Sequence, residues 1–172
     1  MIVRDLLYDA YAWRLRRRLA GRPLPRHVAL VMDGNRRWAR QQGHANPSIG
    51  HQFGAEHVDD LLGWCASIGI GYVTVFVASS DNLRKRESGE VSYLMELAET
   101  VIAERVSAAD NPWRLHLAGR LDLLPDSTRH ALKLARDTTA DRQAGLHLTI
   151  AIGYDGREEI VDALRALLDD AA

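Results

Sequence analysis

HVALVMDGNRRWAR (27–40) begins as a short apolar run and then changes abruptly to a polar, charged segment. Its apolar part, HVALVMD (27–33), contains β-branched residues and is typical of a buried strand. YVTVFVAS (72–79) has the same character, and WRLHLAG (113–119) and LHLTIAI (146–152) complete a set of predicted strands.

Helices are predicted around these strands from apolar spacing and from glycine or proline at their ends. They cover residues 3–20, 51–67, 88–108, from Pro125 to about 140, and 156–168. This alternation indicates an α/β fold, a single domain over 1–172 with a mainly parallel central β-sheet flanked by helices on both faces. Ligands in such folds bind beyond the carboxyl ends of the strands. The polar segments after the first two strands are therefore expected on one rim.

Composition excludes several classes of protein. The net charge of −1 gives no reason to expect a nucleic-acid partner. Cys65 is the single cysteine, so no disulfide framework can form, and its apolar helical setting predicts a buried core thiol. No apolar run reaches about 18 residues and no signal peptide is evident, so a cytoplasmic location is expected.

The segment DGNRRWAR (33–40) has the chemistry of a diphosphate site. Asp33 is a hard oxygen ligand suited to Mg²⁺, which proteins usually hold with one or two carboxylates plus substrate phosphates. Gly34 permits close approach of the backbone to a ligand. Arg36, Arg37 and Arg40 supply bidentate donors for phosphate. The alternative is a charged turn in which Asp33 caps a helix.

The second polar segment, SSDNLRKR (79–86), combines hydroxyls, an amide and cations that a diphosphate can accept from. Its alternative is a solvated turn before the next helix. His51 can also bind a phosphate. Asp59 and Asp60 form a lone acidic pair that fits a solvated helix face better than a metal motif. There is no GxxxxGK[ST] and no GxSxG motif, and a phosphate-binding hydrolase would lack an evident nucleophile and base.

At 27–40 the sequence strongly resembles the cis-prenyltransferase family, which includes undecaprenyl diphosphate synthases. The resemblance continues through GHQFGAEH (50–57), SSDN (79–82), VSYLMEL (91–97) and IAIGYDGREEIV (150–161). It implies a Mg²⁺-dependent enzyme that condenses isopentenyl diphosphate with an allylic diphosphate, such as geranyl diphosphate, to form a Z double bond. The family also implies a homodimer.

The resemblance assigns expected roles to individual residues. Asp33 is similar to the Mg²⁺-linked aspartate, Asn35 to an amide near the reacting centre, and His51 to a histidine that handles protons and phosphate. The residues expected to bind substrate are Gly34, Arg36, Arg37, Trp38, Ser79, Asn82, Arg84 and Arg86. Apolar side chains of helix 88–108 are expected to line a hydrocarbon tunnel, or else to be plain core.

Departures from the family pattern bear on product length. HANPSIG (44–50) is one residue longer than usual and lacks an arginine, a lengthening similar to that of actinobacterial short-chain Z-farnesyl diphosphate synthases. Val77 and Tyr93 stand where smaller residues are common. Because bulk in the tunnel shortens the product, a product of about C15 is expected. The alternative is a longer-chain polyprenyl diphosphate synthase.

Both ends of the sequence carry expectations of their own. Family members continue past the last helix into an RxxGExRxS segment, and this sequence stops at Ala172 without it. A shortened chain is the favoured interpretation, and a non-catalytic partner subunit of a prenyltransferase is the alternative. The basic helix at 3–20 is expected to cover the sheet edge or the substrate entrance, with contact to a membrane surface as its alternative.

Overall fold

The computed structural model describes residues 2–46, 48–85, 88–143 and 145–170 of the chain. Its centre is a four-stranded sheet in which every pairing is parallel, as the sequence predicts. In spatial order the strands are β1 (His27–Val31), β2 (Tyr72–Ala78), β4 (His147–Ile152) and β3 (Arg114–Ala118). Their boundaries lie within two residues of the predicted ones.

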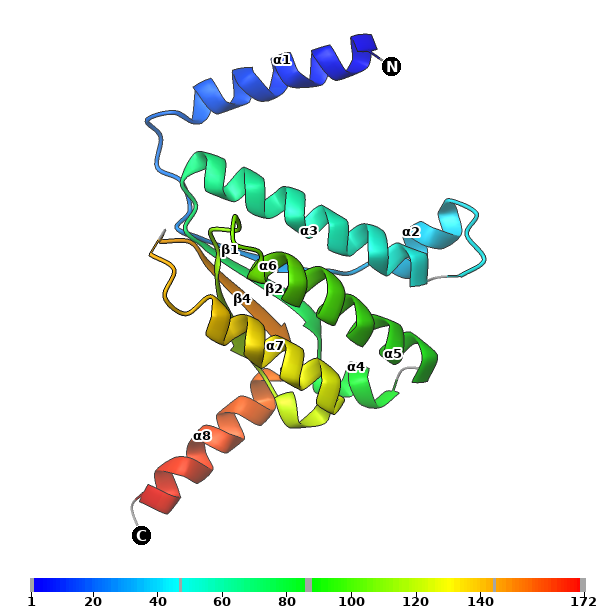
Figure 1. Ribbon diagram of the computed structural model, residues 1–172, viewed down its shortest axis with the longest axis vertical. Helices are drawn as coiled ribbons and strands as arrows, with labels where there is room; N and C mark the ends of the chain where they lie inside the picture. Colours follow the sequence, from blue (N-terminus) through cyan, green and yellow to red (C-terminus); the bar gives the residue numbers. More distant parts are fainter. Residues whose placement is uncertain (1, 47, 86–87, 144, 171–172) are drawn as a thin grey trace.

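The predicted helices are present, and additional short ones begin near the strand ends (Figure 1). The long elements are α1 (Ile2–Leu19), α3 (Ser48–Ile68), α5 (Ser88–Leu97), α7 (Asp126–Thr138) and α8 (Gly156–Asp170). Helix α5 continues through the π-helical η1 (Ala98–Glu104) into α6 (Arg105–Ser107). The short elements are α2 (Asn35–Gln41), α4 (Ser80–Lys85) and the 3-10 helix η2 (Leu121–Leu123).

The hydrophobic core lies between the sheet and the helices α3, α5 to α6, and α7. Val75, Leu115 and Ile150 point from three strands into this core and are at most 1% exposed. Cys65 of α3 belongs to the same core, as predicted, and its burial raises the pKa of the thiol.

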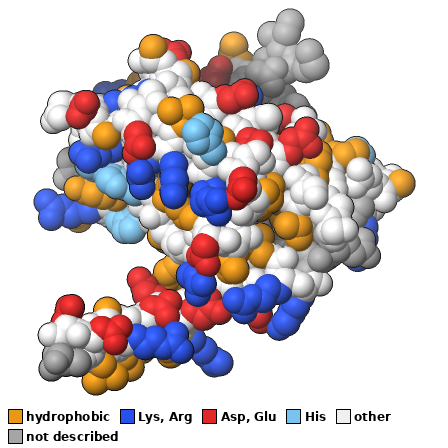
Figure 2. Space-filling model, turned by 60° about the horizontal axis from the view of Figure 1, so that its bottom comes forward, with side chains coloured by type: hydrophobic (Ala, Val, Ile, Leu, Met, Phe, Trp, Pro, Cys, Tyr) orange, Lys and Arg blue, Asp and Glu red, His pale blue; other side chains and the backbone are white. Residues whose placement is uncertain are grey.

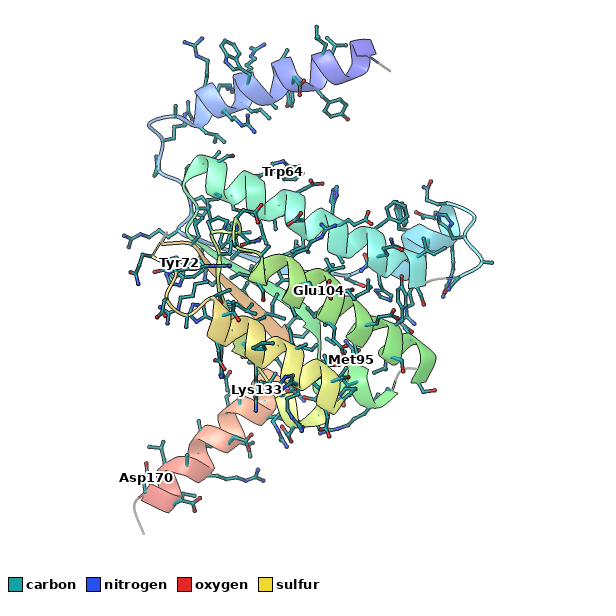
Figure 3. All side chains as sticks on the ribbon, viewed as in Figure 1. Trp64, Tyr72, Met95, Glu104, Lys133 and Asp170 are labelled. Carbon is teal, nitrogen blue, oxygen red and sulfur yellow. The ribbon has the colours of Figure 1, made fainter. Side chains whose placement is uncertain are left out.

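The opposite face of the sheet is open in the part of the chain that the structure describes. Val31 and Tyr72 lie on that face and are 67% and 50% exposed. The prediction that helices cover both faces is therefore wrong for the described residues. Figure 3 places Tyr72 at the sheet end and Trp64 on the side of α3 that faces away from the sheet. In the described part of the chain, the helical layer thus lies on one side of the sheet, and it carries the candidate site.

The first and last helices extend from this body. Helix α1 lies apart from α3 in Figure 1, and its described side chains are almost all exposed, so the prediction that it covers the sheet edge is wrong. Figure 2 shows α8 projecting from the body with hydrophobic side chains along it. Those side chains include Ile160, Leu164 and Leu168, each more than half exposed. Among the described helices, none combines the length and apolarity that a membrane span requires.

Candidate active site

The two polar segments lie side by side at the carboxyl end of the sheet. Strands β1 and β2 are adjacent and parallel, with Val31 paired to Phe76, so the segments that follow them leave the sheet at the same rim. Helix α2 begins directly after β1, and α4 begins directly after β2. The prediction of a shared rim is therefore confirmed.

A polar cavity opens at the start of α2. Gly34 adopts a φ of 91°, which L side chains rarely adopt, and its amide donates to Asp33 Oδ1 at 2.6 Å. A Cβ at this position would also lie 3.3 Å from an Arg37 guanidinium nitrogen. The cavity is lined by Met32, Asp33, Gly34, Asn35, Arg36, Arg37, Arg40 and His51. Three guanidinium groups beside one carboxylate favour a phosphate with a bound Mg²⁺.

The donor set of this cavity, one carboxylate beside three guanidinium groups, fits Mg²⁺ that is shared with a phosphate. No group of three or more histidine, cysteine, aspartate or glutamate side chains arranged to hold a metal occurs among the described residues. Mg²⁺ does not need such a cage, because it keeps several waters and takes phosphate oxygens as ligands. Asp33 is exposed at the cavity, where it can share an ion with a bound diphosphate.

A chain of polar contacts connects the cavity to α5. Asn35 Nδ2 lies 3.4 Å from His51 Nδ1, and His51 Nε2 lies 3.1 Å from Glu90 Oε1. The other Glu90 oxygen lies 3.6 Å from Arg36. The side chains of His51 and Glu90 are only 8% and 15% exposed, so water screens their contact weakly. Glu90 thus orients both His51 and Arg36, although no motif in the sequence singled it out.

Two glycines of α3 let it approach α2 closely enough for these contacts. A Cβ on Gly50 would lie 2.2 Å from the backbone oxygen of Asn35, which is far inside van der Waals contact. A Cβ on Gly54 would lie 3.0 Å from Asn35 Oδ1 and 3.1 Å from the Met32 methyl group. These glycines are four residues apart and therefore share one helix face. The four-residue spacing of Gly50 and Gly54 is a signal from which this packing could have been predicted.

An apolar cavity continues inward from the polar one and shares Met32, Asn35 and His51 with it. It lies between α3, the sheet and the helix running from α5 to α6. Val77 lies in its wall, as do Val58, Val75, Leu94, Leu97, Val101 and Ile150. An apolar cavity behind a cationic mouth matches a molecule with a charged head and a hydrocarbon tail.

Two aromatic residues lie away from these cavities. Tyr93 was expected at the tunnel, but it is not among the lining residues, and its hydroxyl donates to Gln52 Oε1 at 3.4 Å. Trp38 also lines neither cavity. Its ring packs on Phe53 at 4.9 Å and lies 6.0 Å from His44, so it anchors α2 against α3.

The second polar segment forms the first turn of α4. Ser79 Oγ accepts a hydrogen bond from the Asn82 amide at 3.0 Å, which caps the helix. Arg84 lies 3.4 Å from Glu158 of α8. A 2.6 Å hydrogen bond from Lys85 lowers the pKa of Asp81. The side chains on the same rim that line neither the polar nor the apolar cavity are Ser79, Asn82 and Arg84. Arg86 lies outside the described residues.

Glu158 is a second residue that sequence reasoning missed. It connects α8 to the start of α4, because its Oε2 accepts a 2.8 Å hydrogen bond from Ser80, a side chain only 1% exposed. Only the folded structure brings these positions together, since 78 residues separate them in the chain.

Comparisons with known sequences agree with these observations. Residues 31–172 match the family model described as "Putative undecaprenyl diphosphate synthase". An isoprenyl transferase from Streptomyces fradiae is 53% identical, over 98% of this chain and 65% of that protein. A (2Z,6E)-farnesyl diphosphate synthase from Thermobifida fusca is 43% identical, over 99% of this chain and 65% of that protein.

A comparison with solved structures also matches this chain to a prenyltransferase. A lavandulyl diphosphate synthase from Lavandula x intermedia, in complex with dimethylallyl diphosphate, superimposes with a TM-score of 0.76 at 29% identity. The match covers 84% of this chain and 61% of that one. This chain thus spans just under two thirds of the length of the curated relatives it matches. The family match over 31–172 confirms the resemblance seen at 27–40, and the chain belongs to the undecaprenyl diphosphate synthase family of prenyltransferases.

Proposed function

We propose that this chain is a Mg²⁺-dependent cis-prenyltransferase that condenses isopentenyl diphosphate with a short allylic diphosphate, such as geranyl diphosphate, to give a Z-prenyl diphosphate of about C15. The observation that carries the proposal is the union of two cavities. A cationic cavity around Asp33 and three arginines opens into an apolar one through Asn35 and His51. The short product is supported by relatives named (2Z,6E)-farnesyl diphosphate synthase.

The allylic substrate would place its diphosphate in the polar cavity and its hydrocarbon in the apolar one. Arg36, Arg37 and Arg40 would bind the phosphate oxygens and stabilise the charge that gathers on them as the allylic carbon–oxygen bond breaks. Asp33 would hold Mg²⁺, which neutralises part of the leaving diphosphate's charge. The double bond of isopentenyl diphosphate attacks the freed allylic carbon, and one proton is then lost.

Asn35 and His51 lie where the two cavities meet, which is where the reacting carbon would be. His51 is oriented by Glu90, so its ring is held beside the Asn35 amide. This arrangement supports a role for both side chains in positioning the diphosphate and receiving the proton. Ser79, Asn82 and Arg84, on the neighbouring strand end, are proposed to bind the second diphosphate, together with Arg86.

The proposal is tested by a turnover assay. Purified protein is mixed with Mg²⁺, radiolabelled isopentenyl diphosphate and geranyl diphosphate, both as the 172-residue chain and with any C-terminal extension that the natural protein carries. A labelled product of about C15 is expected. A chromatogram dominated by long chains would replace the short-chain assignment. No product from either form, with the allylic diphosphate still bound, would favour a non-catalytic partner subunit.

Replacing Glu90 with alanine is expected to lower turnover about ten- to a hundredfold, the size of effect seen when a group that orients a metal-ligating histidine is removed. Turnover and the unfolding midpoint are measured together. Glu96→Ala on the same helix is the matched control, since that side chain is exposed and outside both cavities. Equal turnover in the Glu90 variant and the unaltered chain would remove the orienting role.

We also propose a homodimer and a cytoplasmic location. The exposed apolar side chains of α8, among them Leu164 and Leu167, support an association surface. Peripheral contact with a membrane is supported by α1, where Leu7 and Trp13 are exposed near a basic last turn. Light scattering after size exclusion tests the dimer, and co-sedimentation with anionic vesicles tests the membrane contact.

A further inference from the structure

The far end of the apolar cavity is bounded by charged side chains. Asp59 of α3 and Arg105 of α6 both line it, and an Arg105 guanidinium nitrogen lies 3.0 Å from Asp59 Oδ2. Asp59 lies about 12 Å beyond His51 at the ~1.5 Å rise of a helix, so the pair lies far from the polar mouth of the cavity. The sequence pattern predicted that Asp59 and Asp60 share a solvated face. Both side chains are indeed more than half exposed, and they differ in partner, because Asp60 pairs with His57 on α3 itself.

A further cavity, the outer cavity, lies on the other side of this ion pair. It is formed mainly by α3 and by the chain between α6 and β3, including Gly63, Ala108 and Trp113. Asp59, Leu62 and Arg105 line both the apolar cavity and the outer cavity. These side chains therefore form the wall between the two spaces. Half of each charged side chain is exposed, so the wall is closed by a contact that can open.

We propose that the Asp59–Arg105 ion pair closes the far end of the hydrocarbon cavity and sets the upper limit of product length. The inference rests on the proposed function. A growing prenyl chain that reaches this wall would have to separate two paired charges and place alkyl groups against them, and desolvating charges without new partners is unfavourable. Without the ion pair, the apolar cavity would join the outer cavity. The growing prenyl chain could then pass beside Leu62 into the outer cavity.

The test compares products made by Asp59→Ala, Arg105→Ala and the unaltered chain under the same assay. The ratio of products longer than C15 to C15 is expected to rise at least about tenfold in both variants. Half-exposed ion pairs contribute little to stability, so both variants should fold, which circular dichroism checks. Asp60→Ala is the matched control, because it removes the neighbouring acid without touching the wall. Combining Asp59→Arg with Arg105→Asp should restore the short product.

A binding experiment separates this inference from the proposed function. The affinity of geranylgeranyl diphosphate relative to that of geranyl diphosphate is measured by calorimetry with Mg²⁺. We expect this relative affinity to increase about tenfold in Asp59→Ala and Arg105→Ala, even if no variant turns over. Unchanged product lengths, or unchanged relative affinities, would contradict the proposal that the ion pair closes the cavity. A lack of turnover in the unaltered chain, with increased relative affinities in the variants, would reject the proposed activity and support the role of the ion pair.

Discussion

Asp33→Ala is expected to lower turnover at least about a thousandfold, at the upper end of what removing a single charge-stabilising group costs an enzyme. The polar cavity would then contain arginines and no carboxylate, since Asp33 is the acid in its lining. Mg²⁺ would lose its protein ligand at the leaving diphosphate. Folding should survive, because the carboxylate is exposed and its hydrogen bond to the Gly34 amide contributes about 1 kcal/mol.

For the same variant, binding of the allylic diphosphate is expected to change in the opposite direction to turnover. Without Mg²⁺, the allylic diphosphate should bind Asp33→Ala at least as tightly as the unaltered chain, since a negative charge has left a site for an anion. Adding Mg²⁺ should tighten binding in the unaltered chain and have little effect on the variant. Calorimetry with and without Mg²⁺ measures this difference. Turnover within about tenfold of the unaltered chain would mean that another group holds the metal.

Asp122→Ala is the control for the loss of an acid on the same rim. Asp122 is exposed after β3 and pairs with Arg120 at 2.7 Å, away from both cavities. The hydrogen bond from Arg120 lowers the pKa of Asp122, so this carboxylate is charged in the assay. Unchanged turnover in this variant would tie the loss to Asp33 itself.

The strands and the shared rim could be predicted because their signals are local. Apolar β-branched runs, each followed by a polar segment, mark β1 and β2, and parallel pairing then brings those segments together. The open face of the sheet was not predicted, although the sequence contains a signal for it. His27, Tyr72 and His147 lie at matching positions of three neighbouring strands, and a polar or aromatic row of this kind departs from a fully buried sheet. The near-continuous apolar runs predict cover on both faces of the sheet, and this row contradicts that prediction.

The residues that complete the site could not be predicted in the same way. Glu90 meets His51 across 39 positions, and the contact depends on how far α5 slides along α3. Apolar periodicity shows which face of α5 is buried but leaves its axial position undetermined. The same reason explains Tyr93: it was expected in the tunnel wall, but the α5 turn that carries it directs the hydroxyl to Gln52. Long-range polar contacts of this kind need the assembled structure.

Gly50→Ala is expected to destabilise the chain by about 1–3 kcal/mol and to reduce turnover with it. The added methyl group would lie 2.2 Å from the Asn35 backbone oxygen and 3.3 Å from the Ala39 Cβ, so α2 and α3 must separate. Asn35 and His51 belong to those helices, and their 3.4 Å contact would lengthen with the separation. Chemical denaturation measures the loss in unfolding free energy, and the turnover assay measures the loss at the site.

Other glycines of the same helix provide the controls that isolate close packing. A Cβ on Gly63 would meet no other atom within 4 Å, and the residue is exposed, so Gly63→Ala should stabilise α3 by about 0.4–1 kcal/mol. Gly54→Ala should lie between the two, because its neighbours are the ends of the Asn35 and Met32 side chains, which can move. This order, with Gly50 worst and Gly63 best, follows from contact distance alone. If all three substitutions stabilised the helix equally, helix propensity would dominate and α2 would not depend on close approach to α3.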